Sequence, residues 1–176
     1  MTMRAAGPAD LDRVMGVELE SFGDWSKGRR TAWSPTAWQA DLDAAAESRA
    51  VTGRLVLIEV DDDRALGVAD FHHVAETCDL DRIMVLPAAR GAGLAGDLLE
   101  SGMRWAAGRG ARRMILETHD ENVAALRLYR SHGFTTISRR PGYYGPGRDA
   151  LVMSAPLPAG EPASPEGPAR TEENHV

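Results

Sequence analysis

A glycine-rich turn lies in the middle of the chain, between a strand predicted over residues 79–85 and a helix predicted over residues 93–107. Its sequence is Arg90-Gly91-Ala92-Gly93-Leu94-Ala95-Gly96. Glycines let backbone N–H groups approach a phosphate closely, and the start of a helix adds a partial positive charge that favours an anion. The arginine can add a full positive charge. The turn therefore predicts a phosphate-binding site, with an ordinary structural turn as the alternative.

The same glycines also match the G-x-G-x-x-G pattern of dinucleotide-binding proteins, and Glu117 follows about 20 residues later, where such proteins have an acidic residue. Three features argue against that class. A five-residue segment that contains Pro87 separates the strand from the first glycine, and an antiparallel hairpin precedes the strand. Too few residues remain for a separate substrate domain. We therefore favour the pyrophosphate of a different ligand.

The order of the predicted elements indicates the fold class. Strands are predicted over residues 4–6, 54–60, 65–74, 79–85, 113–118, 134–139 and 150–155, and helices over residues 8–22, 34–46, 93–107 and 121–132. The polar segment 23–33 is predicted to be a loop. An antiparallel hairpin followed by alternating strands and helices predicts an α/β fold with a mixed, mainly antiparallel sheet flanked by helices. We expect a single domain over residues 1–155.

Composition limits the classes of function. The 176 residues carry a net charge of -6, which argues against nucleic-acid binding. The chain has no apolar run long enough to cross a membrane and no signal-peptide pattern, so a cytoplasmic location is expected. Its single cysteine, Cys78, excludes an internal disulfide and a cysteine-based zinc site. Residues 156–176 are acidic and rich in Pro, Gly and Glu, and they are predicted to form a disordered tail.

The glycine-rich turn and its surroundings resemble a known motif. Val85-Leu86-Pro87 followed by Arg90 to Ala95 is similar to the acetyl-CoA motif of the GNAT N-acetyltransferases, V-x-P and then Q/R-x-x-G-x-G/A. The element order over residues 1–155 resembles that superfamily as well. Further along, the chain resembles the ribosomal-protein alanine N-acetyltransferase (RimI-type) branch at Leu116-Glu117, Asn122, Ala124-Ala125, Leu128-Tyr129, Gly133-Phe134, Arg139-Arg140, Tyr143-Tyr144, Asp149-Ala150 and Met153.

This resemblance implies acetyl-CoA as the co-substrate, no metal, and a set of site residues. Glu117 would be the general base and Tyr129 the general acid. The coenzyme-contacting asparagine would be Asn122. The strand that pairs with the pantetheine arm would present Ile83, Met84 and Val85. The pyrophosphate loop would comprise Arg90, Gly91, Ala92, Gly93, Leu94, Ala95 and Gly96.

The resemblance also implies an acceptor, the α-amine of a protein N-terminus. The alanine of a small-subunit ribosomal protein is the expected target, and the enzyme is expected to be a monomer or a weak dimer. The residues expected to line the acceptor site are Trp33, Asp79, Tyr143 and Tyr144. Acidic residues expected to attract a basic peptide are Glu18, Glu20, Asp70, Glu76, Asp79 and Asp81. Acetylation of a small amine or a lysine side chain, and a non-catalytic acyl-CoA-binding module, remain alternatives.

Overall fold

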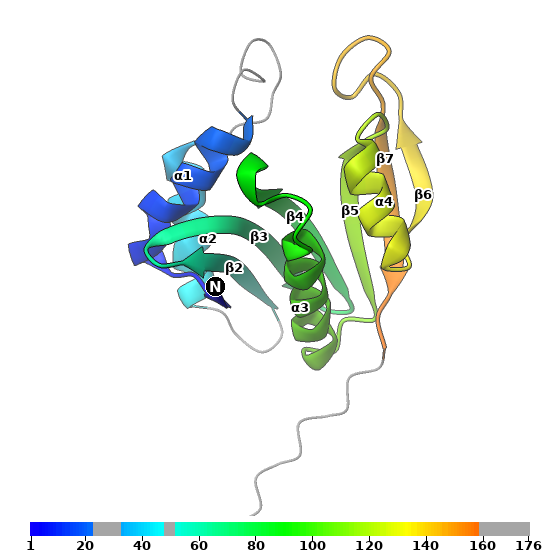
Figure 1. Ribbon diagram of the computed structural model, residues 1–176. Helices are drawn as coiled ribbons and strands as arrows, with labels where there is room; N and C mark the ends of the chain where they lie inside the picture. Colours follow the sequence, from blue (N-terminus) through cyan, green and yellow to red (C-terminus); the bar gives the residue numbers. More distant parts are fainter. Residues whose placement is uncertain (23–32, 48–51, 159–176) are drawn as a thin grey trace, which may run out of the picture.

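The computed structural model describes residues 1–22, 33–47 and 52–158 (Figure 1). The predicted loop up to residue 32, and the predicted tail from residue 159 onward, lie outside the described residues. Strand β7 ends at Pro156, and Leu157 is buried, with its N–H donating to the carbonyl of Arg112 at 2.8 Å. No helix within the described ranges combines the length and the hydrophobicity that crossing a membrane requires.

The described residues form a seven-stranded sheet flanked by four α-helices. The strands are β1 (Thr2–Ala5), β2 (Thr52–Asp61), β3 (Arg64–Val74), β4 (Thr77–Val85), β5 (Arg113–His119), β6 (Thr135–Arg140) and β7 (Ala150–Pro156). The helices are α1 (Leu11–Phe22), α2 (Pro35–Ala46), α3 (Leu94–Gly108) and α4 (Val123–Ser131), with 3-10 turns at Pro8–Asp10 and Pro87–Ala89. These bounds confirm the predicted α/β fold with a mixed sheet.

The sheet has the order β1-β2-β3-β4-β5-β7-β6, so that β7 lies between β5 and β6. The pair β4 and β5 is parallel, whereas the other neighbouring strands in this order are antiparallel. A crossover that contains α3 joins β4 to β5, as a parallel pair requires. The sheet is therefore mainly antiparallel, as predicted, with its one parallel pair in the middle.

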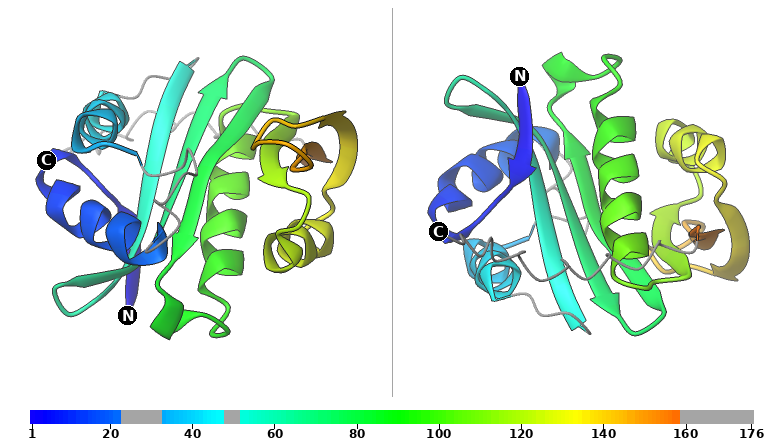
Figure 2. Two further views of the ribbon diagram at one scale, coloured as in Figure 1. Left: turned by 90° about the horizontal axis from the view of Figure 1, so that it is seen from above. Right: turned by 90° about the horizontal axis from the view of Figure 1, so that it is seen from below.

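Helices lie on both faces of the sheet (Figure 2), and each face has its own hydrophobic core. One core contains Leu98 of α3 and Leu126 of α4, and the other contains Val14 of α1 and Trp38 of α2. Side chains alternate between the faces along each strand, because successive residues of a strand point in opposite directions. Helices α1 and α2 therefore cover one face, and α3 and α4 cover the other.

Helix α3 packs unusually close to β3. A Cβ atom on Gly102 would lie 2.0 Å from the ring of Phe71, a distance that no real Cβ atom tolerates. Phe71 is itself fully buried in the core under α3. The glycine therefore fixes how α3 sits on the sheet, and with it the position of the glycine-rich turn at the start of this helix.

Candidate active site

Strands β4 and β5 separate part-way along their length (Figure 1). Their parallel pairing ends at Leu80 of β4 opposite Leu116 of β5, although β4 continues to Val85 and β5 to His119. Backbone groups of β4 beyond that point are paired with β3 on one side only. The separation leaves an open strand edge in the middle of the sheet, where an extended ligand can pair with the backbone.

A β-bulge accompanies this separation. Asp70 of β3 pairs with Arg82 of β4, and the next residue of β3, Phe71, pairs with Leu80, so that Asp81 is the extra residue. A bulge bends its strand and increases the local twist, and bulges are frequent next to active sites. The bulge therefore turns the end of β4 away from β5. It places the predicted pantetheine-binding residues, listed next, on the open edge: Ile83, Met84 and Val85.

The glycine-rich turn lies directly beyond that open edge. Gly91 and Gly93 have φ angles of +83° and +87°, a backbone region that favours glycine over other residues. Gly93 is the N-cap of α3, and no side chain caps the helix there. The turn is exposed, and Nε of Arg90 donates to the carbonyl of Val85 at 3.2 Å. The predicted pyrophosphate loop is thus an exposed helix N-terminus with an arginine beside it.

Asn122 is the N-cap of α4, as Gly93 is the N-cap of α3. Its side-chain Oδ1 accepts a hydrogen bond from the N–H of Ala125 at 3.2 Å, which caps the helix. This capping role adds to the coenzyme contact predicted for the asparagine. The side-chain NH₂ group is a donor that the cap does not use.

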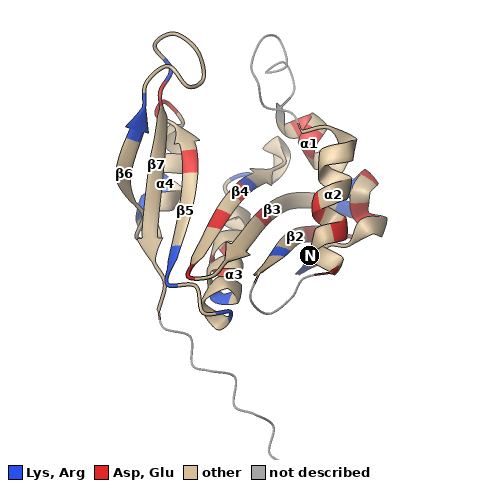
Figure 3. Ribbon diagram, turned by 180° about the vertical axis from the view of Figure 1, so that it is seen from behind, with Lys and Arg blue, Asp and Glu red and all other residues tan. Residues whose placement is uncertain are grey.

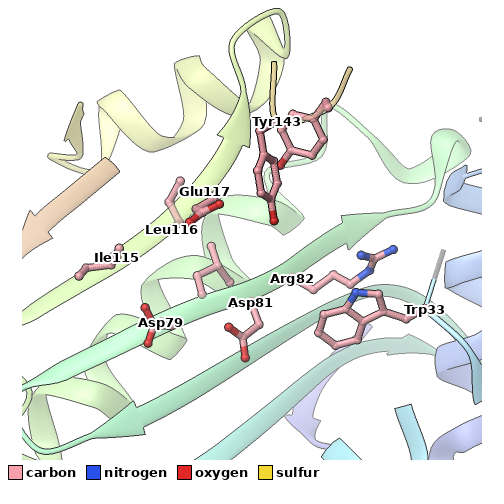
Figure 4. Close-up of a pocket in the computed structure, with 10 residues that line it drawn as sticks. Trp33, Asp79, Asp81, Arg82, Ile115, Leu116, Glu117 and Tyr143 are labelled. Atoms are coloured by element: carbon pink, nitrogen blue, oxygen red, sulfur yellow. The ribbon is translucent and has the colours of Figure 1, made fainter. Parts of the chain in front are cut away.

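On the face covered by α1 and α2, the separation opens into a hollow of about 620 Å³ (Figure 4). Six residues predicted from the sequence line it, namely Trp33, Asp79, Asp81, Glu117, Tyr143 and Tyr144. The last two belong to the loop between β6 and β7, and the ring of Tyr144 stacks on His119 of β5 with centroids 5.2 Å apart. The structure therefore brings the predicted base and the predicted acceptor-site residues together.

Glu117 has a partner that sequence reasoning missed. Nη1 of Arg140, on β6, lies 2.9 Å from Oε1 of Glu117, and the glutamate side chain is 31% exposed. The Arg140 guanidinium also lies 5.6 Å from the centre of the Tyr143 ring. An amine that reaches Glu117 must therefore share the carboxylate with this arginine or displace it.

Tyr129 lies on the opposite face of the sheet from Glu117. It belongs to α4, is 5% exposed, and its ring contacts that of Phe134 with centroids 5.8 Å apart. Burial raises the pKa of Tyr129, and the nearby phenol of Tyr144 raises it further. The phenol therefore stays protonated near neutral pH, which is the form that a general acid needs.

Four of the acidic residues expected to attract a peptide pair with arginines and do not line the hollow, and the expectation is wrong for the two of them that are fully buried. Glu18 and Asp70 are fully buried, where they pair with Arg82 and Arg54. The other two are exposed but paired, Glu20 with Arg64 at 2.7 Å and Glu76 with Arg112 at 3.0 Å. Sequence alone counts these charges but does not reveal the arginines that neutralise them.

Two acidic residues of that group, Asp79 and Asp81, do line the hollow. Figure 3 shows acidic residues on β4 and β5 where these strands separate. Asp81 lies 3.0 Å from Nη1 of Arg54. Asp79 is half-buried, and this burial, followed by the charge of Asp81, raises the pKa of its carboxyl. The acceptor hollow therefore holds three carboxylates in different electrostatic settings, with Glu117 as the third.

Arg82 is a further lining residue that sequence reasoning missed. Its guanidinium lies 4.9 Å from the centre of the Trp33 ring and pairs with buried Glu18 of α1. The same glutamate accepts from the N–H of Trp33 at 2.9 Å and from Nε1 of Trp38 at 3.0 Å. Buried Glu18 therefore positions Trp33 and Arg82, which form one wall of the hollow.

The single cysteine, Cys78, is poorly suited to act as a nucleophile. Cys78 is fully buried in the core under α3. Burial, followed by the charge of Asp79, raises the pKa of its thiol to about 12. A protonated thiol is a poor nucleophile, so the arrangement favours direct transfer between two bound substrates over a covalent cysteine intermediate.

The comparisons with known proteins agree with this geometry. A family model described as "Acetyltransferase (GNAT) family" matches residues 19–134. A mycothiol acetyltransferase of Corynebacterium efficiens is 32% identical over 150 residues, which cover 77% of this chain and 46% of the relative. An aminoglycoside N(6')-acetyltransferase type 1 of Salmonella enteritidis is 28% identical over 139 residues, which cover 74% of this chain and 94% of the relative. The chain spans less than half the length of some curated relatives that it matches.

Solved structures show the same fold. The ribosomal-protein-S18-alanine N-acetyltransferase from Escherichia coli superposes with a TM-score of 0.72 at 23% sequence identity. The superposition covers 94% of this chain and 96% of that protein. At this identity the similarity concerns the fold, which confirms the architecture expected over most of the chain.

Proposed function

The chain belongs to the GNAT acetyltransferase family, and from that premise we propose that it transfers acetyl from acetyl-CoA to the α-amine of a protein N-terminus. An alanine at the start of a small-subunit ribosomal protein, or of a similar basic protein, is the proposed acceptor. One observation carries the proposal. The carboxylate of Glu117 lines the hollow where β4 separates from β5, and the buried phenol of Tyr129 belongs to α4, which covers the opposite face of the sheet.

The residues at the separation fit acetyl-CoA. The open edge of β4 at residues 83–85 offers backbone N–H and C=O groups to the amides of the pantetheine arm. The glycine-rich turn and Arg90 offer positive charge and N–H donors to the pyrophosphate. When bound, acetyl-CoA supplies the activated acetyl thioester. A backbone N–H near Val85 would polarise the thioester carbonyl.

The reaction would be a direct attack. Glu117 removes a proton from the acceptor nitrogen, either directly or through one water, so that the nitrogen can form a bond to the acetyl carbon. Tyr129 donates its proton to the sulfur that leaves. Its burial keeps this proton in place until then, because it disfavours the charged phenolate. The two groups act from opposite faces of the sheet, on either side of the bond that breaks.

The walls of the hollow favour a cationic acceptor. Asp79 and Asp81 contribute negative charge, and the rings of Trp33, Tyr143 and Tyr144 contribute aromatic faces. Carboxylates and aromatic faces both stabilise ammonium groups. A peptide that begins with an α-ammonium and continues with basic residues matches this lining.

A small amine is the second candidate. It is favoured by the sequence similarity to an aminoglycoside N(6')-acetyltransferase that matches along 94% of its own length. The same carboxylates and rings would accept an amino sugar. The peptide remains our first proposal because the downstream motifs from Leu116 to Met153 resemble the ribosomal-protein branch.

Acetyl transfer to a panel of acceptors, read by mass spectrometry, tests the proposal. The panel contains a basic peptide with a free N-terminal alanine, the same peptide with a blocked N-terminus and an internal lysine, and an aminoglycoside. Preferential acetylation of the free alanine supports the proposal, whereas preference for either other acceptor contradicts it. Binding of acetyl-CoA without transfer to any acceptor would instead support a non-catalytic module.

Charge reversal at Asp81 is expected to impair peptide turnover. Asp81→Lys should lower kcat/KM for a basic peptide by about tenfold or more, because it places a positive charge where the peptide's charge would lie. The dissociation constant for acetyl-CoA, measured by calorimetry, should stay unchanged. Asp63→Lys is the matched control, because this aspartate is fully exposed in the turn between β2 and β3. Equal kinetics for both variants would show that Asp81 does not face the peptide.

A further inference from the structure

The chemistry of amine acetylation sets a requirement on the hollow. An α-amine has a pKa of about 8, so about nine-tenths of it arrives as ammonium at pH 7. Its nitrogen carries three protons, and the amide nitrogen of the product carries one. Two protons must therefore leave the nitrogen, one before attack to free the lone pair and one as the N–C bond forms. A single carboxylate takes up one proton at a time.

A second carboxylate stands beside Glu117 on the same face of the sheet. Asp79 of β4 lies opposite Ile115 of β5, two residues before Glu117. Residues two apart on a strand point to the same face, so Asp79 and Glu117 are diagonal neighbours across the pair. Both line the hollow, and the charge of Glu117 contributes to the raised pKa of Asp79. Figure 4 shows the two side chains on neighbouring strands around this space.

The two carboxylates differ in their partners. Glu117 is held by Arg140 at 2.9 Å, whereas no Lys or Arg nitrogen of the described residues lies within ion-pair distance of Asp79. Burial and the charge of Asp81 raise the pKa of Asp79, which makes its carboxylate a stronger proton acceptor than an ordinary aspartate. The charged and titratable groups around Asp79 are His72 on β3, Asp81 and Arg82 on β4, Arg113 and Glu117 on β5, and Tyr143 and Tyr144 from the β6–β7 loop.

We propose that Asp79 takes the first proton, from the ammonium of the acceptor, and that Glu117 takes the second as the N–C bond forms. This inference rests on the proposed acetyl transfer to an amine at this site. In the first step an N–H bond breaks and an O–H bond forms on Asp79. In the second step the N–C bond forms, Glu117 takes the second N–H proton, the C–S bond breaks, and Tyr129 gives its proton to sulfur. When the three groups return to their starting forms, one proton is released to solvent, as the overall reaction requires.

The pH dependence of Asp79→Asn tests this division of labour. Without Asp79 the enzyme depends on the amine that is already neutral in solution. For an α-amine with a pKa of about 8, kcat/KM should fall about 100-fold at pH 6 and about tenfold at pH 7, and should approach the wild-type value at pH 9. Glu117→Gln should instead show a loss that persists at pH 9, because the second proton must leave at every pH.

Three controls keep the result interpretable. Acetyl-CoA binding by calorimetry should be the same for wild type and Asp79→Asn, which shows that the variant folds. Asp43→Asn, an exposed aspartate of α2, should match wild type at every pH. A peptide that carries an aminooxy group in place of its N-terminal amine has a neutral nitrogen at pH 7 and needs no first deprotonation. Wild type and Asp79→Asn should therefore turn it over equally.

The outcomes separate this inference from the proposed function. A loss in Asp79→Asn that is the same from pH 6 to pH 9 would overturn the inference, because the residue would then bind the acceptor without taking its proton. Wild-type kinetics in this variant would overturn it too. If the wild-type enzyme acetylates no amine of the panel, the proposed function fails and the inference fails with it.

Discussion

Replacing Glu117 with glutamine is expected to lower kcat for peptide acetylation by about 10²–10⁴-fold, the usual contribution of a general base. Glutamine has the same shape and its carbonyl can still accept a hydrogen bond from Arg140, but it takes up no proton. The affinity for acetyl-CoA should therefore be unchanged. Steady-state kinetics with the free-alanine peptide and calorimetry with acetyl-CoA measure the two quantities separately.

Tyr129→Phe is the companion variant, because it removes the proposed acid while keeping the buried ring. It should also lower kcat, and its ring should still pack against Phe134. Combining both substitutions should cost little more than the worse single one if the two groups act in one concerted step. If the protein is a non-catalytic acyl-CoA-binding module, both variants will behave as the wild type in every assay.

Much of the fold follows from local sequence patterns. Ser34 before Pro35 predicts a helix start, and Oγ of Ser34 does accept a hydrogen bond from the N–H of Ala37 at 3.1 Å. The glycines of the glycine-rich turn predict a left-handed backbone conformation there, and Gly93 does have a positive φ angle, which glycine favours. Such features depend on neighbours within a few residues, which the sequence displays directly.

The features that sequence reasoning missed depend on distant residues. Glu117 and Arg140 are 23 positions apart, and Glu18 and Arg82 are 64 apart. Their pairing follows from the sheet order, in which β7 lies between β5 and β6, and from the packing of α1 on β4. Counting acidic residues along the chain therefore overestimated the charge available to a peptide, since the fold neutralises Glu18 and Asp70 internally.

Glu18→Gln is expected to lower the free energy of unfolding by about 3–5 kcal/mol, the usual cost of leaving one partner of a buried ion pair alone. Glu18 is fully buried, and the side chain of its partner Arg82 is 11% exposed. Burial already lowers the pKa of Arg82, which shows that its surroundings oppose a positive charge. Trp33 N–H and Trp38 Nε1 donate to different oxygens of Glu18, and glutamine has only one carbonyl oxygen, so the variant loses the negative charge together with one of these two hydrogen bonds. Urea unfolding of both proteins measures the difference.

The same helix supplies the control for this prediction. Glu20, two residues further along α1, pairs with Arg64 at 2.7 Å, but both side chains are more than half exposed. Glu20→Gln should therefore cost less than about 1 kcal/mol, as surface pairs usually do. Equal costs for the two variants would mean that Glu18 does not hold a buried charge in place. Because Glu18 also fixes Trp33 at the wall of the hollow, its loss should raise KM for the peptide at temperatures where the protein is still folded, whereas Glu20→Gln should leave that KM unchanged.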